Sequence, residues 1–341
     1  MKTQKQQKPQ KILFLSYDVN EAISYYRVGG ITEHLSEISN NEITLMQWSN
    51  IGETTWPMLI NGNYDIIFFS RPFTKDVKEF LFYAKLCGKR IWIDHDDNLL
   101  SVNPENKYYT TYMKEEVKQT ICDIVSIADV VSVTTDFLRD VYLKYNKNIW
   151  VIPNAFNDII LKRTKPRERS KTIFWRGSDS HIFNLWSYGK EIISTIDEFN
   201  DWKFTFMGYY PWFIPKGWGY IESTDIMLYF HTLKVIAPSV FHSPINNDNF
   251  NNCRSAISVI EAAYCGAASI VPSFWTYKGQ SPIPGTITYN DNKSYYEALK
   301  ACCSGDVDFE KQSEITWEYV RDMWSLSNIN KIRVELIKTL E

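Results

Sequence analysis

The sequence predicts an α/β fold made of two doubly wound, Rossmann-like domains that face a central cleft. Short, nearly continuous apolar runs alternate with helical patterns along the chain, which is typical of parallel strands covered by helices on both faces. The alternation is interrupted in a charged stretch at residues 158–172 and then restarts. At 341 residues the chain has the length expected of two such domains.

Six apolar runs in the first half are predicted strands, and helical segments lie between them. The helix expected at residues 74–88 ends at Gly88, which is a common stop signal. Strand, helix and strand at this spacing indicate parallel strands joined by crossover helices. The predicted strands are residues 11–17, 42–48, 64–70, 90–95, 129–135 and 148–154.

The same pattern in the second half predicts a second domain. Ligands of open α/β sheets bind at the carboxyl ends of the strands, so the cleft between the domains is the expected site. The predicted strands are residues 172–178, 202–208, 234–240 and 268–273. The expected units are a first domain at 1–157, a linker at 158–171, a second domain at 172–306 and C-terminal helices at 307–341. One arrangement left open is that these C-terminal helices pack back on the first domain.

Composition narrows the class of protein. The net charge of −3 and the pI near 6.0 lack the basic excess of most nucleic-acid-binding proteins. The high aromatic content, 15%, fits either a large aromatic core or stacking on sugars or bases. The six cysteines have no metal-binding spacing, and we expect free thiols in a reducing cytosol. Residues 1–10 lack the apolar core of a signal peptide and no run reaches 18 apolar residues, so we expect a cytoplasmic protein without a membrane span.

Residues 247–273 place two charges in an otherwise apolar pattern. Arg254 and Glu261 are seven positions apart, which is about two turns if both lie on one helix. Burying either charge without a partner is costly. The partner is therefore either the protein itself, through ion pairs, or a bound ligand.

We predict that a helix begins within this stretch. Asn251 or Asn252 can act as the N-cap. Backbone amides at a helix start, together with an arginine, form an anion site suited to a diphosphate. Glu261 lies about 10 Å further along the axis at ~1.5 Å per residue, where a carboxylate can accept two hydroxyls, as from a ribose. The residues of the expected first turn are Cys253, Arg254 and Ser255.

This stretch resembles the donor-binding segment of GT-B glycosyltransferases, in the broad group similar to family 4. The matching residues are Pro244, Phe250, Asn251, Arg254 (where relatives have Lys), Ser255, Glu261, Gly266 and Ser273. The resemblance implies that Arg254 and the helix-start amides bind the diphosphate and that Glu261 binds the nucleotide ribose. Many family members carry a second glutamate eight residues earlier, where this sequence has Cys253. The sugar-binding contribution of that glutamate is therefore absent or replaced here.

Two other stretches resemble the same family. Residues 130–157 are similar to the end of its first domain, and residues 173–185 are similar to the first strand and loop of its second domain. The matches extend over residues 11–290, of which only the segment around Glu261 is a specific motif. The resemblance implies that the donor cleft is lined by Arg176, Gly177, Ser178 and His181.

An acidic cluster, Asp94, His95, Asp96 and Asp97, follows the predicted strand at residues 90–95. Such residues can bind a metal, form a solvated turn, or face an acceptor. Relatives carry a similar I-D-D-D-L-like sequence here, and GT-B enzymes generally hold the diphosphate with protein groups. We therefore expect no metal, Asp94 or Asp96 as the group that orients or deprotonates the acceptor hydroxyl, and His95 and Asp97 as acceptor contacts.

Residues 25–35 follow the first predicted strand and contain Arg27, Gly29 and Gly30. The glycines allow close approach of the backbone to a ligand, and Arg27 is placed to reach an acceptor or a phosphate. The G-x-G-x-x-G spacing is absent, which argues against a nicotinamide enzyme. The aromatic residues of 207–220 fit either a packed loop or stacking on the donor.

The expected function is transfer of a sugar from a nucleotide-sugar donor to an acceptor hydroxyl, without a further cofactor. Retention of configuration is implied by the resemblance alone. A non-catalytic nucleotide-sugar-binding protein is the alternative that Cys253 keeps open.

The expected acceptor is neutral and carbohydrate-like: a glycan, a lipid-linked sugar or a small molecule. Some relatives of the fold glycosylate hydroxymethylated bases, so DNA is the alternative acceptor. DNA requires Lys and Arg along the cleft, whereas the three aspartates of the acidic cluster would repel its phosphates. The local basic run, otherwise read as a solvated linker, comprises Lys162, Arg163, Lys165, Arg167 and Arg169.

Overall fold

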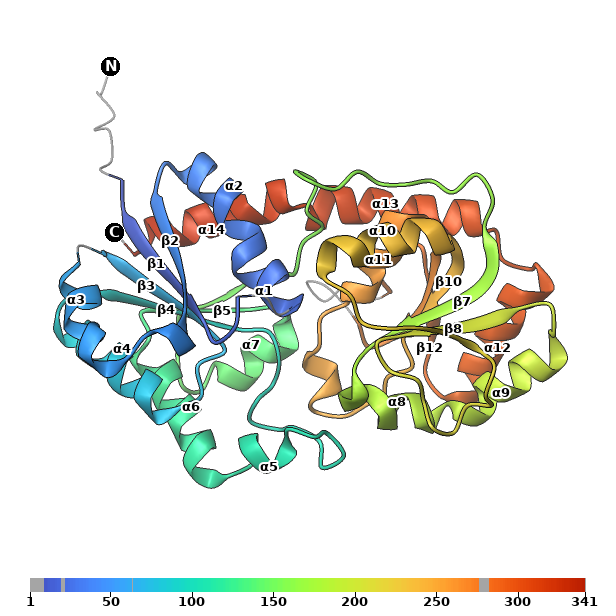
Figure 1. The fold of residues 1–341 in the computed structure, drawn as a ribbon, viewed down its shortest axis with the longest axis horizontal. Helices are drawn as coiled ribbons and strands as arrows, with labels where there is room; N and C mark the ends of the chain where they lie inside the picture. Colours follow the sequence, from blue (N-terminus) through green and yellow to red (C-terminus); the bar gives the residue numbers. More distant parts are fainter. Residues whose placement is uncertain (1–8, 20–21, 63, 276–281, 341) are drawn as a thin grey trace, which may run out of the picture.

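The computed structural model describes residues 9–19, 22–62, 64–275 and 282–340. Within these residues the chain forms two six-stranded parallel sheets, each covered by helices on both faces (Figure 1). The predicted fold class is confirmed. The prediction that residues 1–10 are not a signal peptide concerns a segment of which residues 1–8 lie outside the described residues.

The first sheet has the strand order β2-β1-β3-β4-β5-β6, and all of its pairs are parallel. β2 lies on one side of β1 and β3 lies on the other, so the order in which strands are added reverses at β1. In open α/β sheets, ligands bind at such a switch point, outside the carboxyl ends of the strands. The strands are β1 (Lys11–Ser16), β2 (Glu42–Gln47), β3 (Ile66–Ser70), β4 (Arg90–His95), β5 (Val130–Val133) and β6 (Ile149–Val151). The helices are α1 (Ala22–Arg27), α2 (Gly29–Ser39), α3 (Trp56–Asn61), α4 (Lys75–Leu86), α5 (Tyr109–Tyr112), α6 (Glu115–Ile127) and α7 (Asp136–Tyr142).

The second sheet has the order β12-β11-β10-β7-β8-β9 and is also parallel throughout. Its strands are β7 (Ser170–Arg176), β8 (Lys203–Met207), β9 (Gly219–Ile221), β10 (Pro238–His242), β11 (Ala268–Pro272) and β12 (Thr286–Tyr289). Its helices are α8 (Ile182–Ser187), α9 (Gly189–Glu198), α10 (Ile226–Ile236), α11 (Ile257–Cys265) and α12 (Asn292–Ser304).

The predicted strand at residues 234–240 is wrong in its first half. Lys234, Val235 and Ile236 form the last turn of α10, which ends at Ala237 in the left-handed conformation with φ 45°. The strand begins only at Pro238. Apolar residues alone did not separate the end of this helix from the strand that follows it. The edge strands β9 and β12 were not predicted, because they are short and only partly buried.

The last two helices join the domains. α13 (Phe309–Trp324) packs against α11 and β11 of the second domain, and α14 (Leu326–Lys338) crosses to lie on α2 of the first (Figure 1). Asn330 on α14 donates to the Ile31 carbonyl of α2 at 3.2 Å. Near the crossing, the ring of Phe156 contacts Tyr264 of α11 and Trp317 of α13, with centroids 5.8 and 5.3 Å apart. The two domains therefore share apolar core at their junction.

The basic run between the domains is not a free, solvated linker. Arg163 pairs with Glu314 at 2.8 Å, and Lys165 reaches Glu310 and Glu314 at 3.2 and 2.7 Å. Arg169 pairs with Glu310 at 2.8 Å. The solvated interpretation is wrong for Arg163 and Arg169, because these side chains are largely covered by the acidic face of α13, whereas Lys165 pairs with that face and stays exposed.

Candidate functional site

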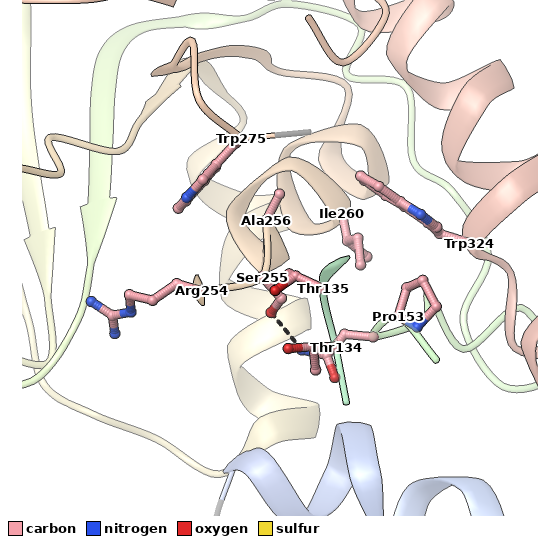
Figure 2. Close-up of a pocket in the computed structure, with 10 residues that line it drawn as sticks. Thr134, Thr135, Pro153, Arg254, Ser255, Ala256, Ile260, Trp275 and Trp324 are labelled. Atoms are coloured by element: carbon pink, nitrogen blue, oxygen red, sulfur yellow. Dashed lines mark hydrogen bonds between the residues drawn. The ribbon is translucent and has the colours of Figure 1, made fainter. Parts of the chain in front are cut away.

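A pocket lies between the domains, where the carboxyl ends of β5 and β6 meet the segment that leads into α11 (Figure 2). This is the edge of the first sheet at which ligands of parallel α/β domains bind. Figure 2 shows Ser255 beside Thr134 and Thr135, and Asn154 donates to the Ser255 hydroxyl at 2.7 Å. The pocket is lined by Thr134, Thr135, Pro153, Asn154, Arg254, Ser255, Ala256, Ile260, Trp275 and Trp324.

The helix in this segment begins later than predicted. Residues Asn251–Cys253 form a separate 3₁₀ turn, Arg254 is extended, and α11 starts only at Ile257. Asp248 causes the break, because its carboxylate accepts the amides of Phe250 and Asn251 at 3.0 and 2.8 Å and closes a local turn first. Asn251 is therefore not the cap of α11.

The start of α11 is open for an anion. The N-cap residue, Ala256, provides no side-chain hydrogen bond. The first amides of a helix have no partner within the helix and carry the positive end of its dipole. Arg254 and Ser255, which precede this helix start, line the same pocket.

Arg254 is a partly buried cation that forms no ion pair with any carboxylate in the described part of the chain. Its Nη1 and Nη2 lie 2.9 Å from the two ring nitrogens of His181, and its guanidinium stands 5.6 Å from the Phe250 ring. Burial lowers the pKa of Arg254. Burial and then Arg254 itself hold the pKa of His181 well below its usual value, so this neighbour is neutral. The arrangement leaves a positive charge with no carboxylate at ion-pair distance among the described residues, although Asp97 and Asp96 lie near enough to act on it. Such a charge favours binding of an anion.

Glu261, in contrast, is paired with the protein. It is 2% exposed and accepts from Arg176 Nε at 2.7 Å, from Arg176 Nη2 at 3.0 Å and from the Tyr26 hydroxyl at 3.0 Å. Tyr26 belongs to α1, so this contact joins the domains. Since Arg254 precedes the helix, Arg254 and Glu261 do not lie two turns apart on one face.

The other residues expected in the donor cleft follow β7. The Gly177 amide donates to the Met207 carbonyl at 3.0 Å, and a Cβ on Gly177 would lie 2.6 Å from the Trp175 ring. The hydroxyls of Ser178 and Ser180 are 2.7 Å apart. The structure thus brings Arg176 and His181 against Glu261 and Arg254, while Gly177 allows the close turn between them.

Asp94 and Arg27 form a buried ion pair rather than an open acceptor site. Arg27 is 1% exposed and Asp94 is 2% exposed. Arg27 Nε donates to Asp94 at 2.9 Å, Nη1 donates to the Ile152 carbonyl at 2.6 Å, and Ser132 donates to Asp94 from the neighbouring strand. The catalytic role of Asp94 and the ligand-binding role of Arg27 stay predictions, and this burial argues against both.

His95 points to the opposite face of β4, as alternation along a strand requires. It is fully buried, and its ring stacks on Tyr142 with centroids 4.9 Å apart. Neither ring nitrogen has a hydrogen-bond partner among the described residues, and burial lowers the pKa of His95 to about 4. This position argues against the predicted contact with an acceptor.

Asp96 and Asp97 share Arg71, which the sequence reasoning missed. Arg71 contacts the Asp96 carboxylate with Nε and Nη2, and its Nη2 lies 2.8 Å from Asp97. Arg71 follows β3 directly, in the left-handed conformation with φ 53°. The rule that drew attention to Asp94, a charged residue at the carboxyl end of a strand, would also have found it. The described residues contain no group of three or more His, Cys, Asp and Glu side chains arranged to hold a metal.

Gly30 serves the packing of helices, and its contact with a ligand stays a prediction. A Cβ on Gly30 would lie 2.2 Å from the Tyr25 carbonyl oxygen of α1, so α2 can follow α1 this closely only with glycine here. A Cβ on Gly29 would make ordinary contacts, with Leu45 at 3.6 Å. Of residues 207–220, Trp218 stacks on Phe204 in the core of the second domain, with centroids 5.6 Å apart, whereas Trp212 is exposed.

No family model matches the chain, and no curated protein matches it. Solved structures do. A UDP-forming α,α-trehalose-phosphate synthase from Burkholderia vietnamiensis is 10% identical with a TM-score of 0.65, over 97% of this chain and 100% of that one. The lipopolysaccharide outer core galactosyltransferase WaaB is 13% identical with a TM-score of 0.59, over 96% and 100%. T4 phage BGT, solved with its UDP-glucose substrate, is 13% identical with a TM-score of 0.57, over 97% and 99%.

The chain has the GT-B glycosyltransferase fold. Among the described residues of this GT-B chain, no helix is long and apolar enough to cross a lipid bilayer. Its pocket also contains residues that sequence reasoning did not select. Thr134, Thr135, Pro153 and Asn154 follow β5 and β6 and are the last residues of the predicted strands at 129–135 and 148–154, so their place at the carboxyl ends of predicted strands was the available signal. Trp275 and Trp324 gave no comparable signal, since they come from separate segments that only the fold brings together.

Proposed function

We propose that this protein is a glycosyltransferase that takes a sugar from a nucleotide-sugar donor and transfers it to an acceptor hydroxyl. The observation that carries the proposal is Arg254, a desolvated cation without a carboxylate partner, beside the uncapped start of α11. A diphosphate complements both features. Structurally similar proteins include a UDP-forming synthase and a protein that binds UDP-glucose, which supports a nucleotide sugar as the donor.

In this proposal the donor-side residues stabilise the leaving group. Negative charge grows on the diphosphate as the bond to the sugar breaks, and Arg254 with the first amides of α11 meets that charge. The ribose contact of Glu261 rests on the resemblance of the donor segment alone, because its carboxylate is 2% exposed and already accepts from Arg176 and Tyr26.

On the acceptor side we assign the orienting carboxylate to Asp97 rather than to the predicted Asp94 or Asp96, of which Asp96 is 6% exposed and paired with Arg71. Asp97 is 22% exposed and its Oδ2 is held by Arg71, whereas Asp94 is enclosed with Arg27. A general base must reach the hydroxyl that it orients or deprotonates. Retention of configuration is part of the proposal and rests on the resemblance of the donor segment alone.

We further propose a neutral, carbohydrate-like acceptor. A DNA acceptor requires free cations along its path, and three basic residues of the interdomain run are occupied by Glu310 and Glu314. If the acceptor is DNA instead, Lys162 and Arg167 are the two cations of this run expected to contact its phosphates.

The test begins with thermal shift against UDP- and GDP-linked sugars, because binding to the native state raises its stability. The sugar that stabilises the protein is then incubated with the protein alone, and release of its nucleoside diphosphate is measured with and without EDTA. We expect slow release that persists in EDTA. Binding without any release would support the non-catalytic alternative. Radiolabel transfer to hydroxymethylated duplex DNA, compared with glycan acceptors, then decides the acceptor class.

A further inference from the structure

The segment Asp248–Ser255, which carries Arg254, belongs to the second domain in sequence but is held by both domains. From the second domain, Asn184 contacts Asn251 and His181 contacts Arg254. Four first-domain side chains donate hydrogen bonds to it from segments that follow the strands of the first sheet. Asn103 Nδ2 donates to Asp248 Oδ2 at 2.9 Å, and Asn98 Nδ2 donates to the Asn249 carbonyl at 3.3 Å. The other two donors are Thr135, to the Cys253 carbonyl at 2.9 Å, and Asn154, to Ser255 at 2.7 Å.

Cys253 adds an apolar contact to these hydrogen bonds. It is buried within a core cluster whose other members, among them Leu99 and Tyr142, all come from the first domain. Burial raises the pKa of its thiol to about 12, so it remains neutral there. Cys253 thus stands at the sequence position of the missing family glutamate, and its side chain packs in the apolar core of the first domain.

The hydrogen bond from Asn103 reaches the residue that shapes this segment. Asp248 accepts the amides of Phe250 and Asn251 with Oδ1, and this turn directs the chain toward Arg254. Asn103 holds the other carboxylate oxygen. The first domain therefore contacts the segment on both sides of the turn, at Asp248 and at Cys253.

We infer that the first domain positions Arg254 for the donor, with Asn103 and Thr135 as positioning residues that act through Asp248 and Cys253. This inference rests on the proposed function. The first-domain contacts add to the contact with His181 in fixing the binding-competent position of Arg254. Loosening the contact lowers the population of that state, and the apparent affinity falls by the same factor. The two positioning residues need not touch the nucleotide to change its affinity.

The first test is Asn103→Asp, which keeps the side-chain shape but places a negative charge against Asp248. We expect its Kd for UDP, or for GDP if that is the nucleotide bound, to rise about tenfold in calorimetry. Asn106→Asp is the matched control: it adds the same charge three residues away, and its Oδ1 accepts only the Tyr108 amide, which an aspartate can also do. The control should bind within about twofold of wild type.

The second test separates positioning from stability. Thr135→Val should weaken nucleotide binding about fivefold, since it removes a hydrogen bond of typical strength, and Thr135→Ser should restore it. Thr135 also caps α7 by accepting the Leu138 amide at 3.2 Å, so some loss of thermal stability is expected as well. Thr120→Val is the control, because its lost hydrogen bond, to Glu116, stays within α6.

The outcomes distinguish this inference from the proposed function. If the wild type binds nucleotide and both Asn103→Asp and Thr135→Val bind equally well, the positioning role is wrong. If Thr135→Ser is as weak as Thr135→Val, the role is wrong for Thr135. Small-angle scattering tests the contact without any ligand: Asn103→Asp should raise the radius of gyration above that of Asn106→Asp, and equal values would contradict the inference. If the wild type binds neither UDP nor GDP, the proposed function falls and the inference with it.

Discussion

Arg27 in the first domain and Arg254 in the second both withdraw a guanidinium from solvent, but their partners differ. Arg27 is held by the Asp94 carboxylate, by the Ile152 carbonyl and by Asn154. Among the described residues, Arg254 contacts the neutral imidazole of His181 and stands over the face of the Phe250 ring, and it lines the pocket. The first charge is neutralised inside the protein, whereas the second has no carboxylate in ion-pair contact among the described residues.

The comparison shows that burial of a charged residue does not by itself identify a functional site. A buried pair that satisfies all of its donors fixes the fold, and breaking it leaves an uncompensated charge. A buried cation with no counter-ion costs free energy in the unliganded protein and regains it when an anion binds. The partner, rather than the residue type, separates the two roles.

The largest effect should come from breaking the paired arginine. Asp94→Ala leaves Arg27 buried without its carboxylate, and we expect a loss of about 3–5 kcal/mol in the free energy of unfolding. Asp136→Ala is the control, because it breaks the partly exposed pair with Arg139 and should cost less than ~1 kcal/mol. Urea unfolding followed by circular dichroism measures both. Equal midpoints for the two variants would remove the distinction drawn here.

The next prediction concerns His95, a buried base beside this pair that stays neutral. Its pKa is lowered to about 4, whereas an unfolded histidine titrates near 6.5. The unfolded state therefore binds more protons between these values. The resulting stability is fully present above about pH 6.5 and is lost as the pH falls toward 4, by about 3 kcal/mol in total.

His95→Phe should flatten this part of the pH profile, because the replacement ring can stack on Tyr142 and does not titrate. His231→Gln, at an exposed position on α10, is the control and should keep the wild-type slope. Urea midpoints at pH 7 and pH 5 provide the measurement. An unchanged slope in His95→Phe would mean that other groups cause the acid sensitivity.

Substituting Arg254, the arginine without an ion pair, should change the free energy of ligand binding without lowering that of unfolding, and the change should be smaller than those above. Arg254→Ala should weaken nucleoside diphosphate binding more than about tenfold, or ~1.4 kcal/mol. It should leave thermal stability unchanged or raise it, because no ion pair is lost and a desolvated charge is removed. Arg321→Ala, which breaks an exposed pair on α13, is the control for both measurements. Loss of stability with intact binding would reverse the assignment of Arg254.

The fold and the position of the candidate pocket were predictable because they depend on local patterns. Apolar runs such as residues 64–70 and 90–95 predicted buried parallel strands, and the carboxyl ends of the strands are the edge at which the pocket lies. The start of α11 was mispredicted because Asp248 accepts the Phe250 and Asn251 amides and closes a competing turn. Local preferences for an N-cap do not reveal which of two adjacent turns continues as a helix.

The partners of the charged residues were not predictable, because they are distant in sequence. Arg27 and Asp94 are 67 positions apart, and Arg176 and Glu261 are 85 apart. The sequence indicated that each charge needs a partner, but only the folded chain shows whether the partner is protein. This information decides which of the predicted site residues are available to a ligand.

The smallest expected effect on the free energy of unfolding concerns two paired cations, Arg163 and Lys165, in the basic run between the domains. Arg163 is 9% exposed, pairs with Glu314 and stands 5.1 Å from the Trp317 ring, whereas Lys165 is exposed and pairs with the same helix. Arg163→Ala should lower the free energy of unfolding by about 1 kcal/mol through the lost stacking and hydrogen bonds. Lys165→Ala should leave the urea midpoint within the scatter of wild-type repeats, since exposed pairs contribute little and are screened by salt.

Binding of hydroxymethylated duplex DNA by the same two variants, measured by fluorescence anisotropy at low and moderate salt, is the second readout. Because both side chains are already occupied by α13, neither variant should change it, and a weaker DNA complex in Lys165→Ala would show that these cations serve a ligand as well as the fold.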